Sequence, residues 1–427
     1  MSISTRKLAI MVFFLLLLLT TAIFVVNDKP AESEPILASS ASNTELIARG
    51  AYLAKAGNCA SCHTAEGGEF MAGGLAFDTP FGTLYSTNIS PDPETGIGDW
   101  SERDFLNSMR HGLRPNGEHL YPAFPYTAFT KIENEDVLAL YTYFRSIPAV
   151  PQTAFENSLT FPFNIRSLMA VWKTLFFDAG EFKTNESQNE QWNRGAYLVD
   201  ALAHCSACHS PRNLLGAEKT HLAMSGGEYI DRVNNEAKRP WSAPNITATQ
   251  RGLDLWSHQD LKDYLKTARN DILESFGPMN EVIINSTSYL SEDDVGAMAT
   301  YLKNLTPIAV ALGSAPDPQL MGRGRTIYNL HCGTCHLPTG EGDPKMAPKL
   351  HAGSLVVQSE NPASMINAIL YSPKTPGPPL LPKWRHPMEE FQYLLDDNEV
   401  AAVASFIRNS WSNSAGIVTA EHVARQR

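Results

Sequence analysis

The sequence predicts an all-α protein made of three tandem copies of one small helical domain, placed after an N-terminal membrane helix. The first observation is a cysteine–histidine motif that occurs three times at wide intervals. The second is a helical pattern that recurs around each motif, and the third is an apolar run near the N-terminus. With 427 residues, the chain is long enough for several domains of ordinary size.

The apolar run predicts a signal anchor over residues 1–30 that crosses a membrane. Residues 8–26 are nineteen positions without a charge, just enough for a helix to span a bilayer. Arg6 and Lys7 precede them, and basic residues keep that end of the chain in the cytoplasm. A cleaved signal peptide is the alternative. In both cases we expect everything after the run to be exported.

The net charge, and the motifs that the sequence lacks, exclude several classes of function. The formal net charge is -11, which argues against a nucleic-acid partner because phosphate binding requires clustered Lys and Arg. The sequence shows no dinucleotide-binding glycine loop, nucleophile elbow or zinc-protease helix. We therefore expect no catalytic site within the chain itself.

The repeated motif is a pair of cysteines separated by two residues and followed at once by histidine. It occupies residues 59–63, 205–209 and 332–336 and uses every cysteine of the chain: Cys59, Cys62, Cys205, Cys208, Cys332 and Cys335. Two thiols about one helical turn apart can each bond to a haem vinyl group, and the adjacent histidine then lies under the iron. The motif predicts three covalently bound haem c groups, with His63, His209 and His336 as proximal iron ligands.

Two other uses of paired cysteines are a structural zinc site and a redox dithiol. Neither explains a histidine after every pair, and with 12 His among 427 residues three such coincidences are not expected. Bacteria complete c-type haem attachment outside the cytoplasm, which agrees with export. The haem interpretation is therefore preferred.

Sequence around the motifs also repeats. The string Arg-Gly-Ala-Tyr-Leu stands at 49–53 and again at 194–198, with a looser form at 323–328, and amphipathic helices at 135–145, 292–303 and 398–408 close the three units. Helix, haem turn, loop and closing helix is the plan of a class-I-like cytochrome c domain, in which strands contribute little. The predicted domains are 44–148, 189–306 and 320–411, joined by linkers at 149–188 and 307–319 and followed by a C-terminal tail at 412–427.

A sixth iron ligand, commonly methionine, raises the potential of an electron-transfer haem and closes the iron to small molecules. Met279 and Met388 each follow a proline in the loop before a closing helix, and we predict that they are the distal ligands of the second and third haems. In the first unit the corresponding position is Phe124, which cannot bind iron. Either this haem is five-coordinate or another side chain replaces the methionine, the candidates being Met71, Met109, His111 and His119.

With these residues in place, the chain resembles the three-haem cytochrome c subunits of bacterial membrane-bound dehydrogenases, including those for alcohol, aldehyde, gluconate and nicotinate. The likeness extends from about residue 45 to the C-terminus. Its markers are TPFGTLYSTNI at 79–89, LYPAFPY at 120–126, GPMNEV at 277–282 and SFIRNSW at 405–411. Family members usually have methionine at the position of Phe124. The Phe form looks more like the cytochromes that serve molybdenum hydroxylases.

The resemblance implies an electron-transfer subunit in the bacterial inner membrane, with its haem domains on the periplasmic side. A quinoprotein, flavoprotein or molybdenum hydroxylase would oxidise its substrate there. Electrons would then pass through the three haems to ubiquinone or to another cytochrome or oxidase. Two other functions stay open: a free-standing membrane-anchored electron carrier, and a haem enzyme or gas-binding protein that acts at an open first haem.

Overall fold

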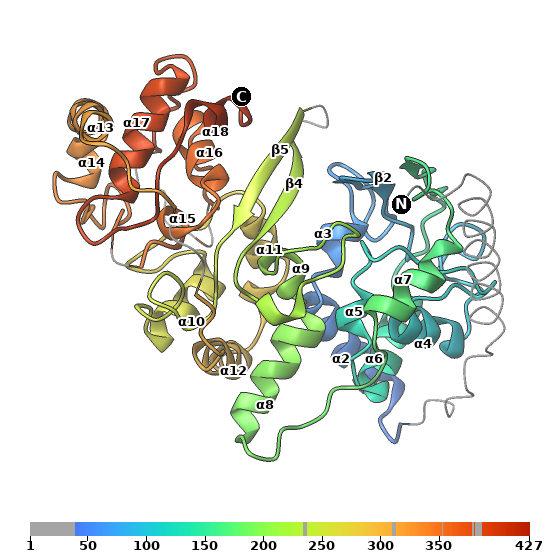
Figure 1. The fold of residues 1–427 in the computed structure, drawn as a ribbon. Coiled ribbons are helices and arrows are strands. Elements are labelled where there is room, and N and C mark those ends of the chain that lie inside the picture. Colours follow the sequence, from blue (N-terminus) through green and yellow to red (C-terminus); the bar gives the residue numbers. More distant parts are fainter. Residues whose placement is uncertain (1–38, 234–236, 310–312, 352, 378–379, 381–386) are drawn as a thin grey trace, which may run out of the picture. The chain divides into compact units, whose positions relative to one another are not determined.

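The computed structural model describes residues 39–233, 237–309, 313–351, 353–377, 380 and 387–427 (Figure 1). The chain divides into two compact units. The first contains the residues up to Leu53 together with 63–182, and the second contains 54–62 together with 183–427. The second unit therefore includes the second and third repeats and also a short segment of the first.

The first unit is helical with one small sheet. Its elements are α2 (Asn43–Ala56), α3 (Cys59–His63), α4 (Glu102–His111), α5 (Tyr126–Phe129), α6 (Asn134–Ser146) and α7 (Leu168–Phe176), with strands β1 (Ala76–Thr79), β2 (Gly82–Tyr85) and β3 (Ser158–Leu159). Residues 54–56 of α2 and all of α3 except His63 belong to the second unit. Helix α4 begins at a capping box formed by Ser101 and Asp104 and ends at Gly112, which is left-handed.

The second unit contains the other two repeats. The second repeat is formed by α8 (Glu190–Tyr197), the π-helical turn η1 (Leu198–Leu202), α9 (Ser206–His209), the short turn η2 (Thr220–Leu222), β4 (Gly227–Val233), β5 (Ala237–Ala243), α10 (His258–Thr267), α11 (Met279–Asn285), η3 (Thr287–Tyr289) and α12 (Glu292–Lys303). The third repeat is formed by α13 (Pro318–His331), α14 (Gly333–His336), α15 (Leu355–Gln358), α16 (Ala363–Tyr371), α17 (Asp397–Arg408) and α18 (Ala420–Ala424).

The repeated Arg-Gly pair fixes how the first and last helices of each repeat cross. The glycine, which is Gly50, Gly195 or Gly324, lies directly on a backbone carbonyl of the closing helix, so that any Cβ there would collide with it. The preceding arginine reaches an acidic residue near the start of the same helix. Arg194, for example, donates from Nε and Nη2 to the two carboxylate oxygens of Asp294, both at 2.7 Å. The motif is therefore a helix-packing device.

The prediction of an all-α fold is wrong, because the described residues include two small antiparallel sheets. In the first unit β2 pairs with both β1 and β3, and in the second β4 pairs with β5 from Gly227 opposite Ala243 onward. Two prolines explain why these strands were not predicted from the sequence. Pro80 lies in the turn between β1 and β2, and Pro240 lies within β5, where proline argues for a loop. A two-stranded ribbon tolerates Pro240 because both of its strands are edge strands.

The membrane helix in the predicted fold class is likewise not found. Residues 1–30, on which that prediction falls, lie outside the described residues. Within the part of the chain that the structure describes, no helix combines the length and the apolar character needed to cross a membrane. The corrected fold is a series of helical repeats with two small antiparallel sheets.

Candidate haem sites

A backbone carbonyl holds each predicted proximal histidine. The Nδ1 atoms of the three rings lie 2.7, 2.8 and 2.9 Å from carbonyl oxygens, in the pairs His63–Thr87, His209–Pro244 and His336–Pro348. Because a carbonyl only accepts, Nδ1 carries the proton and Nε2 keeps its lone pair for a metal. Burial lowers the pKa of His63 and of His209, which favours the neutral ring that an iron ligand requires. The same arrangement occurs at all three motifs.

An Asn-Ile pair follows both Thr87 and Pro244, and its role becomes visible in the structure. The side-chain oxygens of Asn88 and Asn245 accept from the backbone N–H two residues later, at 2.9 and 2.8 Å. Their amide groups donate to a carbonyl at the start of the following linker, at 2.7 and 2.8 Å. These bonds shape the turn that presents the carbonyl to the histidine. The repetition of the pair was the signal that could have revealed this role.

The cysteines lie on the short helices α3, α9 and α14 or immediately before them, and they are half-buried. Burial raises the pKa of Cys59, Cys205 and Cys332 to about 12. A redox dithiol requires the opposite, a thiol whose pKa is lowered so that the thiolate forms. No three His, Cys, Asp or Glu side chains converge as a metal cluster within the described residues, which gives no support to a structural zinc site.

Matching hydrogen bonds place Phe124 and Met279 at equivalent positions. In the first unit the N–H of Leu120 donates to the carbonyl of Gly112 at 2.8 Å, and in the second the N–H of Ser275 donates to the carbonyl of Ala268 at 2.8 Å. Gly112 and Ala268 are both left-handed residues that end equivalent helices. Phe124 and Met279 each follow four residues after the donor. The structure therefore supports the alignment made from the sequence.

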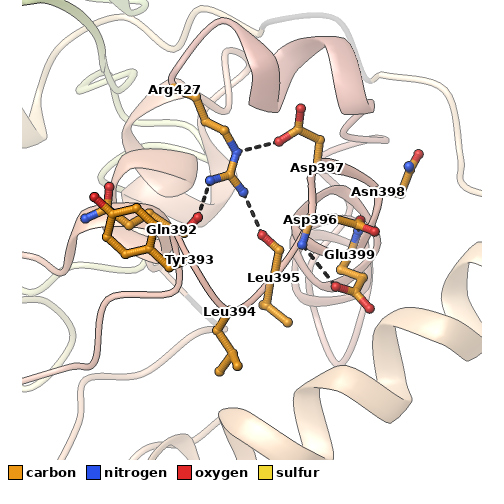
Figure 2. Close-up of a pocket in the computed structure, with 9 residues that line it drawn as sticks. All are labelled: Gln392, Tyr393, Leu394, Leu395, Asp396, Asp397, Asn398, Glu399 and Arg427. Atoms are coloured by element: carbon orange, nitrogen blue, oxygen red, sulfur yellow. Dashed lines mark hydrogen bonds and ion pairs between the residues drawn. The ribbon is translucent and has the colours of Figure 1, made fainter.

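Met388 is half-buried against the hydrophobic core of the third repeat. Arg427 binds the loop that follows Met388. Together with residues 392–399 it lines a surface pocket (Figure 2). The Arg427 guanidinium donates to the carbonyls of Gln392 and Leu395, the latter at 2.7 Å, and pairs with Asp397 at 2.5 Å. Residues near the C-terminus thus help to hold the segment that carries Met388.

Each of the four side chains that could serve as the sixth ligand of the first haem has an equivalent residue in the second repeat. Met71 corresponds to Met224, Met109 to Leu265, His111 to Thr267 and His119 to Glu274. The match of Met71 with Met224 is detailed: both are buried, both have a left-handed φ, of 60° and 63°, and both donate their N–H to a hydroxyl oxygen, at 3.1 and 3.0 Å. Because these counterparts differ from the predicted distal ligand Met279, the match between the repeats gives none of the four the position of a ligand.

Three buried polar atoms near these sites indicate that a further group belongs there. Within the described residues no hydrogen-bond partner is found for the hydroxyl of Tyr126, the indole N–H of Trp241 or Nε2 of His351, one in each repeat. A buried polar atom left unpaired costs on the order of 1–3 kcal/mol. The carboxylates of haem propionates are acceptors suited to such donors. The residues present therefore fit haem c.

Known proteins agree with this assignment. The cytochrome c family matches residues 47–148 and 321–411. The chain is 37% identical to the gluconate 2-dehydrogenase cytochrome c subunit of Pantoea cypripedii, over 92% of this chain and 91% of that protein. It is 34% identical to the fructose dehydrogenase cytochrome subunit of Gluconobacter japonicus, over 94% of this chain and 86% of that protein.

A third relative is much longer than this chain. It is one of the subunits of the nicotinate dehydrogenase of Pseudomonas putida, 42% identical over 86% of this chain, but the match spans only 30% of that protein. The resemblance found in the sequence is confirmed by these relatives together with the family match. The chain therefore belongs to the cytochrome c family, among the cytochrome c subunits of dehydrogenases, and is an electron-transfer protein with covalently bound haem c.

Proposed function

We propose that the chain carries three haem c groups and passes electrons from a dehydrogenase catalytic subunit to ubiquinone or another respiratory acceptor. The observation that carries the proposal is the arrangement of a histidine and a backbone carbonyl, found at each of the three cysteine motifs. Bound haem supplies an iron that gains or loses one electron. This chain supplies two thiols and a histidine at each motif, and a methionine in the second and third repeats.

Contacts within the second unit support electron exchange between the first and second haems. Residues 54–62, which carry the thiols of the first motif, pack there against the end of α11. The side-chain amide of Asn285 donates to Oγ of Ser61 at 2.8 Å, and Oγ of Ser286 donates to the carbonyl of Ala56 at 3.3 Å. Burial, and after it the charges of Cys59 and Cys208, raises the pKa of Cys62 to about 12. The thiols of two motifs therefore lie close enough to interact.

The catalytic partner in this proposal is a quinoprotein, a flavoprotein or a molybdenum hydroxylase. Relatives that match most of this chain are named as cytochrome subunits of gluconate and fructose dehydrogenases, which supports a dehydrogenase partner. We further propose that the haem domains work on the periplasmic side, since basic residues precede the apolar run and c-type haem is attached outside the cytoplasm.

The test is to extract the native protein in mild detergent, follow it by its haem absorbance and identify what is purified with it. We expect three haems per chain and a stoichiometric dehydrogenase whose substrate reduces all three. A cytochrome that purifies alone, and that no dehydrogenase of the same cells can reduce, would contradict the proposed partner. A pyridine haemochrome value of two haems per chain would contradict the proposed number.

A further inference from the structure

We propose that the first haem has no sixth ligand from the protein and that its iron binds small diatomic molecules, such as carbon monoxide and nitric oxide. The inference rests on the proposed attachment of a haem at the first motif and goes beyond the electron-transfer role. Its basis is the equivalence of Phe124 and Met279, which follows from the matching hydrogen bonds of the two repeats. The first repeat thus has the loop of the predicted distal ligand, with phenylalanine in place of methionine.

The ring of Phe124 lies where the methionine side chain of the second repeat begins. It is half-buried and rests against Phe129, with 5.4 Å between the ring centroids. A phenyl ring has no lone pair to give to iron, and its bulk hinders the approach of a longer side chain from another element. A diatomic molecule is much smaller than a side chain and requires only a small displacement of the ring. The position is thus closed to side chains and open to small ligands.

Side chains elsewhere in the first unit do not make up for the loss. Four side chains have counterparts in the second repeat other than the predicted ligand Met279: Met71, Met109, His111 and His119. Helix α7 is special to the first unit and adds the buried residues Met169 and Lys173. Nζ of Lys173 donates to the carbonyls of His111 and Gly112, at 2.6 and 2.7 Å, so that its amine is already engaged. Met169 is the side chain of α7 whose possible binding to the iron requires a direct test.

Tyr126, close to Phe124 in the chain, has both aromatic and polar neighbours. It is fully buried, and its ring packs against Phe177 with 5.1 Å between the ring centroids. Its hydroxyl has no hydrogen-bond partner within the described residues. Nζ of Lys173 lies 4.9 Å from the centroid of the same ring, so an ammonium group is close by as well. Carbon monoxide and nitric oxide bind reduced haem through the d electrons of the iron and need no charged partner, so the proposed ligand class is a neutral diatomic molecule.

The repeat provides a reciprocal experiment on the full-length, haem-loaded protein. Carbon monoxide is added to the dithionite-reduced protein, and the shifted fraction of the Soret absorbance is measured. We expect about one third of the haem to respond in the wild type, none in Phe124→Met, and about two thirds in Met279→Phe. Phe124→Leu, which changes the size of the side chain but supplies no ligand, should respond like the wild type. Electron paramagnetic resonance should show one high-spin ferric haem that Phe124→Met removes.

The inference fails if the wild type carries three haems and none of them binds carbon monoxide. It also fails if the weak long-wavelength absorbance band of methionine bound to ferric haem corresponds to three haems and drops by one third in Met169→Leu. These outcomes leave the electron-transfer proposal intact. A haemochrome assay that finds two haems, with the first motif unmodified by mass spectrometry, would instead refute the three-haem proposal on which the inference rests.

Discussion

The side-chain amide of Asn285 donates a 2.8 Å hydrogen bond to Oγ of Ser61, one of the two residues between the cysteines of the first haem motif. Asn285 is the last residue of α11, and Met279 is the first. A helix of seven residues thus begins at the predicted distal ligand of one haem and ends on the attachment turn of another. The coordination of the second haem and the position of the first are therefore mechanically connected.

Replacing Asn285 with alanine tests this connection. We expect the variant to keep all three haems but to have a lower midpoint potential at the second haem, because α11 holds Met279 less firmly without its anchor. The loss of stability should be about 1 kcal/mol, the usual contribution of one hydrogen bond. Potentiometry and thermal unfolding measure the two effects. Asn398→Ala, which changes an exposed asparagine of α17, is the matched control and should alter neither quantity.

The methionine ligand itself can be tested by Met279→Ala. The haem at the second motif should stay attached, since its thioether bonds and His209 are unchanged. Its potential should fall and its iron should become open to carbon monoxide, because methionine stabilises the ferrous state and blocks the sixth position. Redox titration with carbon monoxide difference spectra measures both. A spectrum and potential identical to those of the wild type would show that Met279 is not the ligand.

Two glycines of α13 provide a matched pair for the helix crossing. Gly324→Ala should destabilise the protein by about 1–3 kcal/mol, because its new methyl group is forced into the carbonyl of Ala402 on α17. Gly322 has no atom within 4 Å of such a methyl group. Gly322→Ala should therefore be neutral or stabilising by up to about 1 kcal/mol, since alanine favours a helix. Denaturant unfolding of the two variants should give opposite signs, and equal effects would contradict the packing role.

The first unit should lose stability in mild acid through His119. Burial, and after it the charge of Lys173, lowers the pKa of His119 to about 4. In the unfolded chain the pKa is about 6.5, so between pH 6.5 and 4 the unfolded chain binds a proton that the folded chain does not. The free energy of unfolding should therefore decrease as the pH falls through this window, by about 2 kcal/mol.

Urea unfolding at pH 7 and at pH 4.5 measures this loss. His119→Gln should reduce the difference between the two pH values, whereas His221→Gln, a change at an exposed histidine, should leave it as it is. An unchanged pH dependence in His119→Gln would mean that other groups control the acid sensitivity of the first unit.

The sequence was most informative where chemistry depends on residue identity and spacing. Cysteine pairs followed by histidine indicate covalently bound haem c, and the position in the loop before the closing helix placed Phe124 opposite Met279. A backbone carbonyl has no signature in the sequence, so the hydrogen bonds of Thr87 and Pro244 to the histidines were not predicted. Strands β1, β2 and β5 were missed because prolines in and beside them resemble loop signals. The union of residues 54–62 with the second unit depends on tertiary contacts that no local pattern encodes.

The second unit contains residues 54–62 of the first repeat, and this affects the order in which contacts can form. A sequence repeat normally suggests a module that can be cut out and folded alone, but Ala56 and Ser61, in and beside the first attachment turn, accept hydrogen bonds from Ser286 and Asn285 of the following repeat. A ribosome delivers that turn well before α11 exists. The residues of that turn are therefore synthesised before the residues that they contact in the folded protein. A fragment that ends after the first repeat would lack these contacts and should hold its attachment turn less firmly than the full chain does.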